Sequence, residues 1–497
     1  MTAVTDDVRV LRARLLGEVV VPGDDDWDDA RQAWNLAVDQ RPAAVAFRES
    51  PEDVIAIVAF ARERGLRVAP QGTGHNANPL GPLEDTILVK TSRMTGVAID
   101  PQARQARVEA GVLWADVTAA AAEHGLAALA GSSPDVGVVG YTLGGGIGWL
   151  ARKHGLAANS VVAVELVTAD GRLVRADHEH ESELFWAVRG GGGSFGVVTA
   201  IEFRLLPISE VYAGVLFWPL ERASEVLHAW RRWIETVPDE VTSVGRIMQF
   251  PPVPDIPEPF RGQSFVLVEA TLLGTEAEGD QLLRPLRELG PAIDTFAMIP
   301  ASKLEELHMD PPHPVPGAGD GMLLGDLPAE GIDAFVAAAG PGSGSSLVSV
   351  ELRHLGGALG RSTPEEGVLG TLDAAFALFS VGFVPTAELK AATEAQIDCV
   401  RDAMDPWDAG RSYSNFSERR REAGSFFRAE SYDRLRAVKA EWDAEDVFRS
   451  NHPIPPGPPH GESNRPSGSR RRSAAPVSYE RKKGGSSRAA SATIPMP

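Results

Sequence analysis

The sequence predicts an α+β protein in which an irregular first half is followed by a longer antiparallel sheet backed by helices. Between residues 38 and 207, short apolar strands and helices follow one another without the regular alternation of a parallel α/β fold. After Pro207 the strands lengthen and amphipathic helices separate them, which favours an antiparallel sheet with helices on one face. A chain of 497 residues has room for two or three domains of this kind.

Capping and turn signals place the elements of the first half. Ser50 has the form of a helix N-cap, and Gly65 closes the apolar helical pattern that follows it. The Asp-Gly turn at 170–171 predicts a β-hairpin. We expect further strands at 44–49, 66–72, 86–92, 96–101, 106–111 and 197–207, and helices in the N-terminal segment 1–37 and at 114–125 and 183–190.

The second half is predicted from its longer apolar runs. In the strand that contains Glu351, this carboxylate and Arg353 fall on one face and His354 on the other. Cys399, the only cysteine, excludes an intrachain disulfide, and its amphipathic helix predicts a buried thiol. The expected strands are 211–220, 264–274 and 346–359, and the expected helices are 222–237, 279–289 and 388–404.

Composition and charge exclude several classes of protein. The chain has 48 basic and 68 acidic residues, which argues against nucleic-acid binding by the folded core. No apolar run approaches the roughly 18 residues of a membrane span. The charged N-terminus has no apolar signal-peptide core, so we expect a cytoplasmic protein outside the membrane. Residues 457–497 are rich in Arg and Lys and poor in apolar side chains, which predicts a disordered basic tail.

Three glycine-rich clusters, at 72–76, 131–148 and 190–196, dominate the first half. Glycine lets backbone N–H groups approach a ligand closely, as in loops that bind phosphates. Each cluster could be a set of tight turns, but three in one domain favour an anion of dinucleotide size. The third cluster contains G-x-G-x-x-G, yet a helix precedes it and a strand follows it, the reverse of a Rossmann fingerprint. The histidine spacings predict no metal site.

Three motifs resemble the vanillyl-alcohol oxidase superfamily of FAD enzymes. They are PQGTGHNANPLG, GSSPDVGVVGYTLGGGIGWLARKHGL and FWAVRGGGGSFGVVT. Two stretches near the end, Tyr413-Ser-Asn-Phe and VFRSNHPIPP, resemble the berberine-bridge branch of that superfamily. The match runs in order from about residue 40 to 456. The resemblance implies a PCMH-type FAD-binding domain of two subdomains at 38–207, a substrate domain at 208–405 and a segment 406–456 that returns to the FAD domain.

The resemblance implies FAD as cofactor and assigns residues to it. His75 stands where the family bonds a histidine to the flavin 8α-methyl group. Ser133 replaces the cysteine that forms a second bond in bicovalent relatives, so a single link is expected. Val136 stands at the position that gates oxygen, and a valine there resembles the oxidases. The implied FAD-binding residues are Gln71, Gly72, Thr73, Gly74, His75, Asn76, Gly131, Ser132, Ser133, Val136, Gly137, Gly140, Tyr141, Gly145, Gly146, Gly148, Val198, Tyr413 and Asn415.

The expected reaction is hydride removal from a small alcohol, sugar, phenol or amine-type metabolite, with the electrons passing to O2 to give H2O2. Tyr413 is the first candidate for the base, with a packing aromatic as the alternative, and Asn415 would orient the ring or the substrate. Glu351 is a second candidate base, and Tyr141 stands where many relatives carry a histidine. Two alternatives stay open, a dehydrogenase with another electron acceptor and a flavin-binding protein without turnover.

Overall fold

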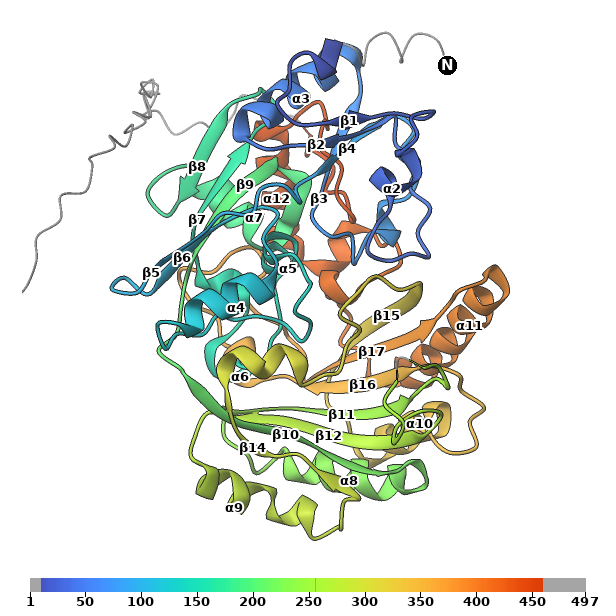
Figure 1. Cartoon of the computed structure of the whole chain (residues 1–497). Coiled ribbons are helices and arrows are strands. Elements are labelled where there is room, and N and C mark those ends of the chain that lie inside the picture. Colours follow the sequence, from blue (N-terminus) through green and yellow to red (C-terminus); the bar gives the residue numbers. More distant parts are fainter. Residues whose placement is uncertain (1–9, 255, 459–497) are drawn as a thin grey trace, which may run out of the picture. The chain divides into compact units, whose positions relative to one another are not determined.

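Three β-sheets organise the described part of the chain, two in its first half and a larger one in its second half (Figure 1). The computed structural model describes residues 10–254 and 256–458, and these residues belong to one compact unit. The basic tail predicted at 457–497 lies outside the described residues from 459 onward.

The first sheet has a parallel core and one antiparallel edge. Its strands, in spatial order, are β1 (Val19–Val20), β2 (Ala44–Phe47), β4 (Thr86–Lys90) and β3 (Arg67–Gln71). Helix α3 (Pro51–Arg64) connects β2 to β3 in the chain, and the predicted cap is present, because Ser50 Oγ accepts a hydrogen bond from the Asp53 backbone N–H. Gly65 ends this helix in the left-handed conformation, at φ 64°.

The second sheet is antiparallel throughout. Its order is β5 (Val97–Asp100), β6 (Gln105–Glu109), β9 (Val197–Arg204), β7 (Val161–Val167) and β8 (Leu173–Asp177). The helices of this region are α4 (Trp114–Ala122), α5 (Val138–Leu143), α6 (Ala151–His154) and α7 (Ser182–Gly191). Their apolar side chains form one core with the sheet, in which Trp114, Phe185 and Phe203 are fully buried.

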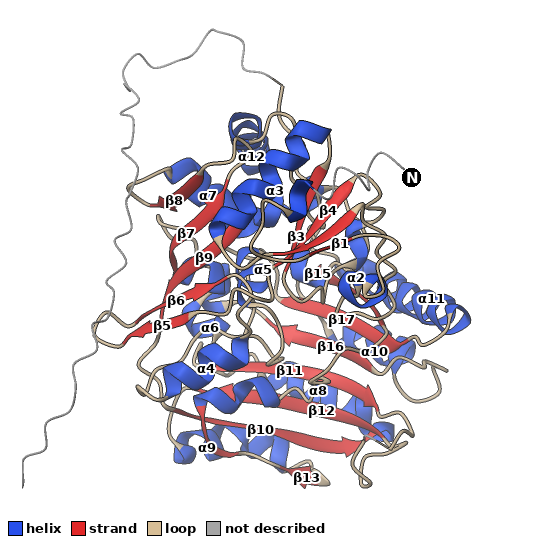
Figure 2. Cartoon of the chain, turned by 45° about the horizontal axis from the view of Figure 1, so that its top comes forward, coloured by secondary structure: helices blue, strands red, loops and turns tan. Residues whose placement is uncertain are grey.

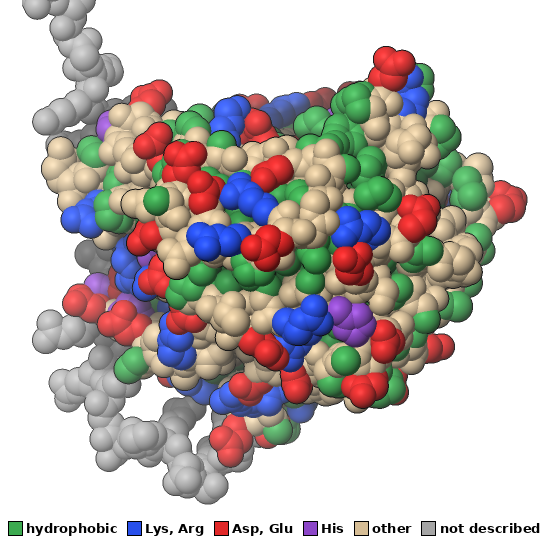
Figure 3. Space-filling model, turned by 90° about the horizontal axis from the view of Figure 1, so that it is seen from below, with side chains coloured by type: hydrophobic (Ala, Val, Ile, Leu, Met, Phe, Trp, Pro, Cys, Tyr) green, Lys and Arg blue, Asp and Glu red, His purple; other side chains and the backbone are tan. Residues whose placement is uncertain are grey.

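The third sheet carries helices on one face and turns its other face toward the first half of the chain (Figures 1 and 2). Its order is β13 (Ile293–Asp294), β10 (Glu210–Pro219), β12 (Ser264–Leu272), β11 (Val241–Gln249), β16 (Ser349–His354), β17 (Phe376–Phe383) and β15 (Gly317–Leu324), and β14 (Ala297–Pro300) also pairs with β10. The helices are α8 (Ala223–Trp233), α9 (Glu276–Arg287), α10 (Ala329–Ala339) and α11 (Ala387–Met404). Trp218, Trp230 and Phe335 fill the core between the sheet and these helices. On the helix-backed side, acidic and basic side chains are interspersed (Figure 3).

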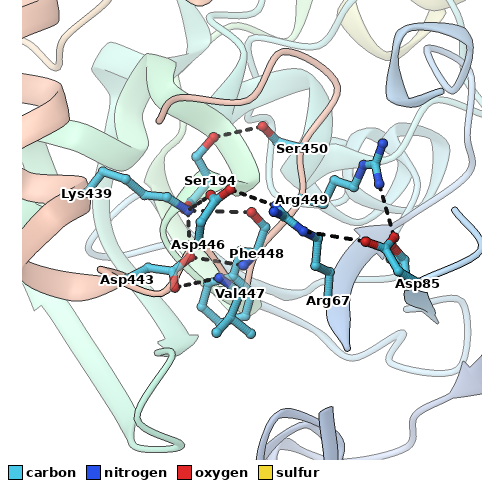
Figure 4. Close-up of polar contacts among 11 residues, drawn as sticks. Arg67, Asp85, Ser194, Lys439, Asp443, Asp446, Val447, Phe448, Arg449 and Ser450 are labelled. Atoms are coloured by element: carbon cyan, nitrogen blue, oxygen red, sulfur yellow. Dashed lines mark hydrogen bonds and ion pairs between the residues drawn. The ribbon is translucent and has the colours of Figure 1, made fainter. Parts of the chain in front are cut away.

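The C-terminal segment returns to the first half of the chain through buried polar contacts (Figure 4). On α12 (Ala429–Trp442), Lys439 Nζ donates to the Ser194 carbonyl at 2.8 Å and lies 2.5 Å from Asp443 Oδ2. Asp443 in turn accepts the backbone N–H groups of Val447 and Phe448. Lys439 and Asp443, with the main-chain groups that they bind, are called the C-terminal cluster below.

Two sequence expectations are wrong. The N-terminal segment 1–37 is helical only at residues 10–12 and Trp27–Arg31 among its described residues, because Val19–Val20 pairs with β2 instead. Cys399 is exposed rather than buried, since its side of α11 turns away from the core. No helix of the described residues is long and apolar enough to cross a bilayer.

Candidate functional site

The first predicted loop follows β3 and holds His75 from two sides. Thr73 Oγ1 lies 2.7 Å from His75 Nδ1, and Asp135 Oδ1 lies 3.3 Å from Nε2. The indole of Trp34 stacks on the imidazole, with ring centroids 3.9 Å apart and 18° between the planes. These contacts fix both the plane of the ring and its rotation. Sequence reasoning missed Trp34, because it comes from the segment that was expected to be helical.

The second loop, which leads into α5, supplies the carboxylate beside His75. Asp135 accepts hydrogen bonds from Trp34 Nε1 at 2.5 Å and from Ser133 Oγ at 2.9 Å. Burial favours the neutral acid, but the interactions with His75 and these donors outweigh it and hold the pKa of Asp135 below its ordinary value. Ser133 therefore binds the carboxylate that approaches His75. Asp135 was not among the predicted site residues.

The turn after α5, at residues 144–148, contacts the C-terminal segment around residues 413–415. The Tyr413 hydroxyl accepts the Gly146 backbone N–H at 2.9 Å, and Asn415 Nδ2 donates to the Tyr141 carbonyl at 2.9 Å. Asn415 Nδ2 also lies 3.2 Å from the Tyr413 hydroxyl. Glycine is required at Gly144, because a Cβ there would lie 1.9 Å from Asn415 Oδ1. The structure therefore brings Tyr413, Asn415 and Tyr141 together.

Both phenols of this group resist ionisation. Burial raises the pKa of Tyr413 well above its ordinary range, against the hydrogen bonds that it accepts. Burial, together with the nearby Tyr413, also raises the pKa of Tyr141. At neutral pH both side chains are therefore neutral phenols. Because the Tyr413 oxygen already accepts a hydrogen bond from Gly146, its hydroxyl proton is available to a ligand.

A row of buried charges lies on the face of the third sheet that turns toward the first half of the chain. It consists of the buried Arg246, Glu269, His308 and Glu351 and the partly exposed Arg353, called the sheet cluster below. His308 Nδ1 lies 2.6 Å from Glu269 Oε2, and His308 Nε2 lies 2.7 Å from Glu351 Oε2. Arg353 Nε donates to Glu351 Oε1 at 2.6 Å, and Arg246 Nη1 donates to Glu269 Oε1 at 3.1 Å.

The charges of the sheet cluster shift one another's pKa values. Burial lowers the pKa of His308, but Glu269 and Glu351 outweigh this effect and raise it to about 9. Burial opposes ionisation of Glu351 too, yet Arg353 and His308 hold the pKa of this carboxyl well below its ordinary value. At neutral pH the cluster therefore alternates cations and anions. Of the two carboxylates in the cluster, only Glu351 was a predicted site residue. His308 has no motif or residue spacing in the sequence that would have identified it.

The end of the sheet cluster reaches the glycine loops. Arg353 Nη2 lies 3.4 Å from Ser132 Oγ, which also bonds Asp310 at 3.2 Å. The Arg353 guanidinium lies over the ring of Phe416, 5.2 Å from its centroid. The predicted face of β16 therefore meets both the second loop and the C-terminal segment.

Two buried polar atoms around the loops, Asn76 Oδ1 and the Tyr141 hydroxyl, have no hydrogen-bond partner among the described residues. His75 Nε2 faces Asp135 Oδ1 at 3.3 Å without an aligned hydrogen bond. Buried polar groups are normally hydrogen-bonded, so orphaned atoms beside glycine-rich backbone are the features expected around a polar ligand. The residues present therefore fit a bound dinucleotide such as FAD. Within residues 10–254 and 256–458, no group of acids, histidines and cysteines has a geometry that could hold a metal.

The remaining predicted cofactor residues are distributed around this centre. The Gln71 side chain packs against Gly74 of the loop and hydrogen-bonds Gln40 and Lys90. Val198 lies on β9, where its carbonyl accepts a hydrogen bond from the buried Arg48 at 2.9 Å. The other predicted positions of the second glycine region lie on the loop before α5, on α5 itself and on the turn after it, and they are Gly131, Val136, Gly137, Gly140, Gly145 and Gly148.

Comparison with known proteins agrees with this geometry. Residues 42–177 match the family model described as an FAD binding domain, and residues 412–455 match the one described as berberine and berberine like. The (R)-6-hydroxynicotine oxidase of Paenarthrobacter nicotinovorans is 29% identical over 460 residues, covering 88% of this chain and 97% of the relative. An uncharacterized FAD-linked oxidoreductase of Bacillus subtilis, YgaK, is 28% identical and covers 90% of this chain and 98% of the relative.

Solved structures show the same architecture. A BBE-like protein of Physcomitrella patens superposes with a TM-score of 0.79 at 22% identity, over 90% of this chain and 99% of that one. The 6-hydroxy-D-nicotine oxidase of Arthrobacter nicotinovorans superposes with a TM-score of 0.76 at 26% identity, over 88% of this chain and 98% of that one.

The fold and the matched domains define an FAD-dependent oxidoreductase. Within that class, the chain belongs to the berberine-bridge-enzyme-like branch of the vanillyl-alcohol oxidase superfamily, with the PCMH-type FAD-binding fold.

Proposed function

We propose that the protein is an oxidase that holds FAD through a single bond to His75 and oxidises a small alcohol, sugar, phenol or amine-type metabolite with O2. The observation that carries the proposal is the position of His75, at the end of a glycine loop with a carboxylate at one ring nitrogen and a hydroxyl at the other. Ser133 supports a single link, because its hydroxyl binds Asp135 and has no sulfur to offer.

Bound FAD supplies the two-electron acceptor for a hydride that leaves a substrate carbon. The residues of this chain position the substrate and receive its proton. Tyr413 donates its hydroxyl proton to a substrate heteroatom and is held in place by Gly146 and Asn415. Its raised pKa makes it a poor base, so we assign proton acceptance to the sheet cluster.

Within the sheet cluster, Glu351 and His308 differ in basicity. The cations around Glu351 keep it ionised and weaken it as a base. His308 loses its proton near pH 9 and is then the stronger acceptor. We therefore assign to Glu351 the orientation of His308 and the balancing of its charge. The uptake of the substrate proton is assigned to the fraction of His308 that has lost its own proton, a fraction that grows as the pH approaches 9.

O2 as the electron acceptor is supported by the names of two relatives. The 29% identical relative is a 6-hydroxynicotine oxidase, and a glucooligosaccharide oxidase of Sarocladium strictum is 31% identical over 223 residues. Their names also support a small amine or sugar as the substrate class. Val136, half-buried against the core of the first half, is the residue proposed to leave O2 access to the flavin.

The test is acid precipitation of the yellow protein as wild type and as His75→Ala. We expect flavin in the pellet for the wild type and in the supernatant for the variant, followed by O2 consumption in a screen of amines, phenols and sugars. Flavin release from both proteins would disprove the covalent link. Flavin reduction by a substrate without O2 consumption would indicate a dehydrogenase instead.

A further inference from the structure

We infer that Asp135 is the positioning residue that prepares His75 for covalent attachment of FAD, an inference that rests on the histidyl link proposed above. Trp34 stacks on one face of the imidazole and at the same time donates its indole N–H to Asp135. Ser133 donates to the same carboxylate. These contacts fix the ring and the carboxylate relative to each other.

The donors and acceptors around the ring select one tautomer. An ionised carboxylate only accepts hydrogen bonds, so Asp135 favours a proton on His75 Nε2, 3.3 Å away. The Thr73 hydroxyl, 2.7 Å from Nδ1, can donate to the other nitrogen. Nδ1 therefore keeps its lone pair, which is the form of imidazole that can attack carbon. The same arrangement of acid and imidazole activates nucleophiles in other enzymes by stabilising the cation that develops.

The attachment balances with O2 as the oxidant. A bond forms between His75 Nδ1 and the flavin 8α carbon, and one C–H bond of that methyl group breaks. The imidazole also loses its Nε2 proton, which Asp135 accepts and passes to solvent. The two electrons released by forming the new bond are taken by O2, and with the two protons they give H2O2. The net reaction joins histidine and FAD and consumes one O2.

The experiment follows covalent incorporation of FAD into apoprotein made under riboflavin limitation. Saturating FAD is added in air, and samples are denatured in acid at intervals and read by in-gel flavin fluorescence. The variants are Asp135→Asn, which keeps the size and loses the proton acceptor, and Asp85→Asn as a matched control. Asp85 is a largely exposed carboxylate of the first half of the chain that pairs with Arg449, away from His75. Non-covalent FAD binding is measured separately by flavin fluorescence quenching.

We expect Asp135→Asn to attach FAD at least tenfold more slowly than wild type while still binding it, and Asp85→Asn to match wild type. Attachment by Asp135→Asn at the wild-type rate would overturn the inference and leave the histidyl link intact. Wild-type protein that binds FAD and never attaches it would overturn both. If Asp135→Asn does not fold, Asp135→Ala with added formate replaces it. Acceleration by formate supports the role of the carboxylate, and its absence contradicts that role.

Discussion

Two buried clusters in this chain both pair basic with acidic side chains, but they differ in the groups that the charged side chains bind. In the C-terminal cluster, Lys439 and Asp443 are both fully buried. They bind each other and the main chain of residues 194, 447 and 448, and Lys439 also pairs with Asp446. In the sheet cluster, side chain binds side chain in a row that ends at Arg353, beside the second glycine loop. The first arrangement continues through Asp446 to the partly exposed Arg67, and the second ends where the flavin and substrate are proposed to bind.

The difference teaches how to tell a structural ion pair from a functional one. Burying a charge costs desolvation free energy. An opposite charge and additional hydrogen bonds offset that cost. The sheet cluster leaves His308 with a pKa of about 9 and Glu351 Oε2 without an aligned hydrogen bond. Strongly perturbed pKa values cluster at functional sites. The comparison therefore predicts loss of stability alone from the first cluster, and loss of function together with a pH-dependent loss of stability from the second.

The largest effect is expected for Lys439→Met. Removing the lysine leaves the buried carboxylate of Asp443 without its cation, which costs about 3–5 kcal/mol of unfolding free energy. Urea unfolding measures this loss. The control is Lys153→Met, whose partly exposed pair with Glu240 contributes less than about 1 kcal/mol. Equal losses in the two variants would break the comparison.

The next effect is the pH dependence of stability that His308 contributes. Its pKa is about 9 in the folded protein and 6.5 ordinarily, so the stabilisation is complete below pH 6.5 and is lost as the pH rises through 9. Each unit of pKa difference contributes about 1.4 kcal/mol. Unfolding free energies of wild type and His308→Gln should therefore differ most at pH 6 and converge above pH 9. A difference that stays constant with pH would show that His308 is neutral in the folded protein.

The same titration predicts the pH dependence of turnover. If His308 accepts the substrate proton, kcat/KM rises with pH until His308 deprotonates near pH 9. Stopped-flow reduction of the flavin measures this once a substrate is known. The rise should disappear in His308→Gln. A profile with no change between pH 6 and 10 would move proton acceptance away from this residue.

The smallest predicted effect is a shift of the flavin midpoint potential in Arg353→Gln. A cation near the flavin stabilises the added electrons, so its loss should lower the potential by on the order of 30 mV, a tenfold change in a two-electron equilibrium. Arg353→Lys keeps the charge and should retain most of the potential. Dye-coupled reduction titration measures both. If Lys439→Met shifted the flavin midpoint potential by the same amount, the proposed difference between the two clusters would be wrong.

Much of the fold could be predicted because its signals are local. The Ser50 cap, the Gly65 stop and the Asp-Gly hairpin each depend on a few adjacent residues. Strand β15 was missed because Gly319 and Gly321 give it little strand propensity. A Cβ would collide with the Phe379 side chain at Gly319 and with backbone carbonyl oxygens at Gly321.

The candidate site could be predicted only where the motifs are contiguous. The loop around His75 and the Tyr413–Asn415 pair form continuous stretches, and the structure brings them together. Trp34 and Asp135 are about a hundred positions apart in the chain, and only the folded backbone reveals their contact. His308 belongs to the loop before β15 and has no helical or strand pattern to mark it. Residues that act through long-range contacts leave no local signal.

The central claim is that FAD lies between the glycine loops, the C-terminal segment and the sheet cluster. Hydrogen–deuterium exchange of His75→Ala with and without FAD tests it directly, because this variant should bind the cofactor reversibly. We predict slower exchange on FAD addition at residues 72–76, 131–148 and 413–417, a smaller effect at 349–354, and none at 439–448. Protection confined to 439–448, or spread evenly over the chain, would contradict the proposed site.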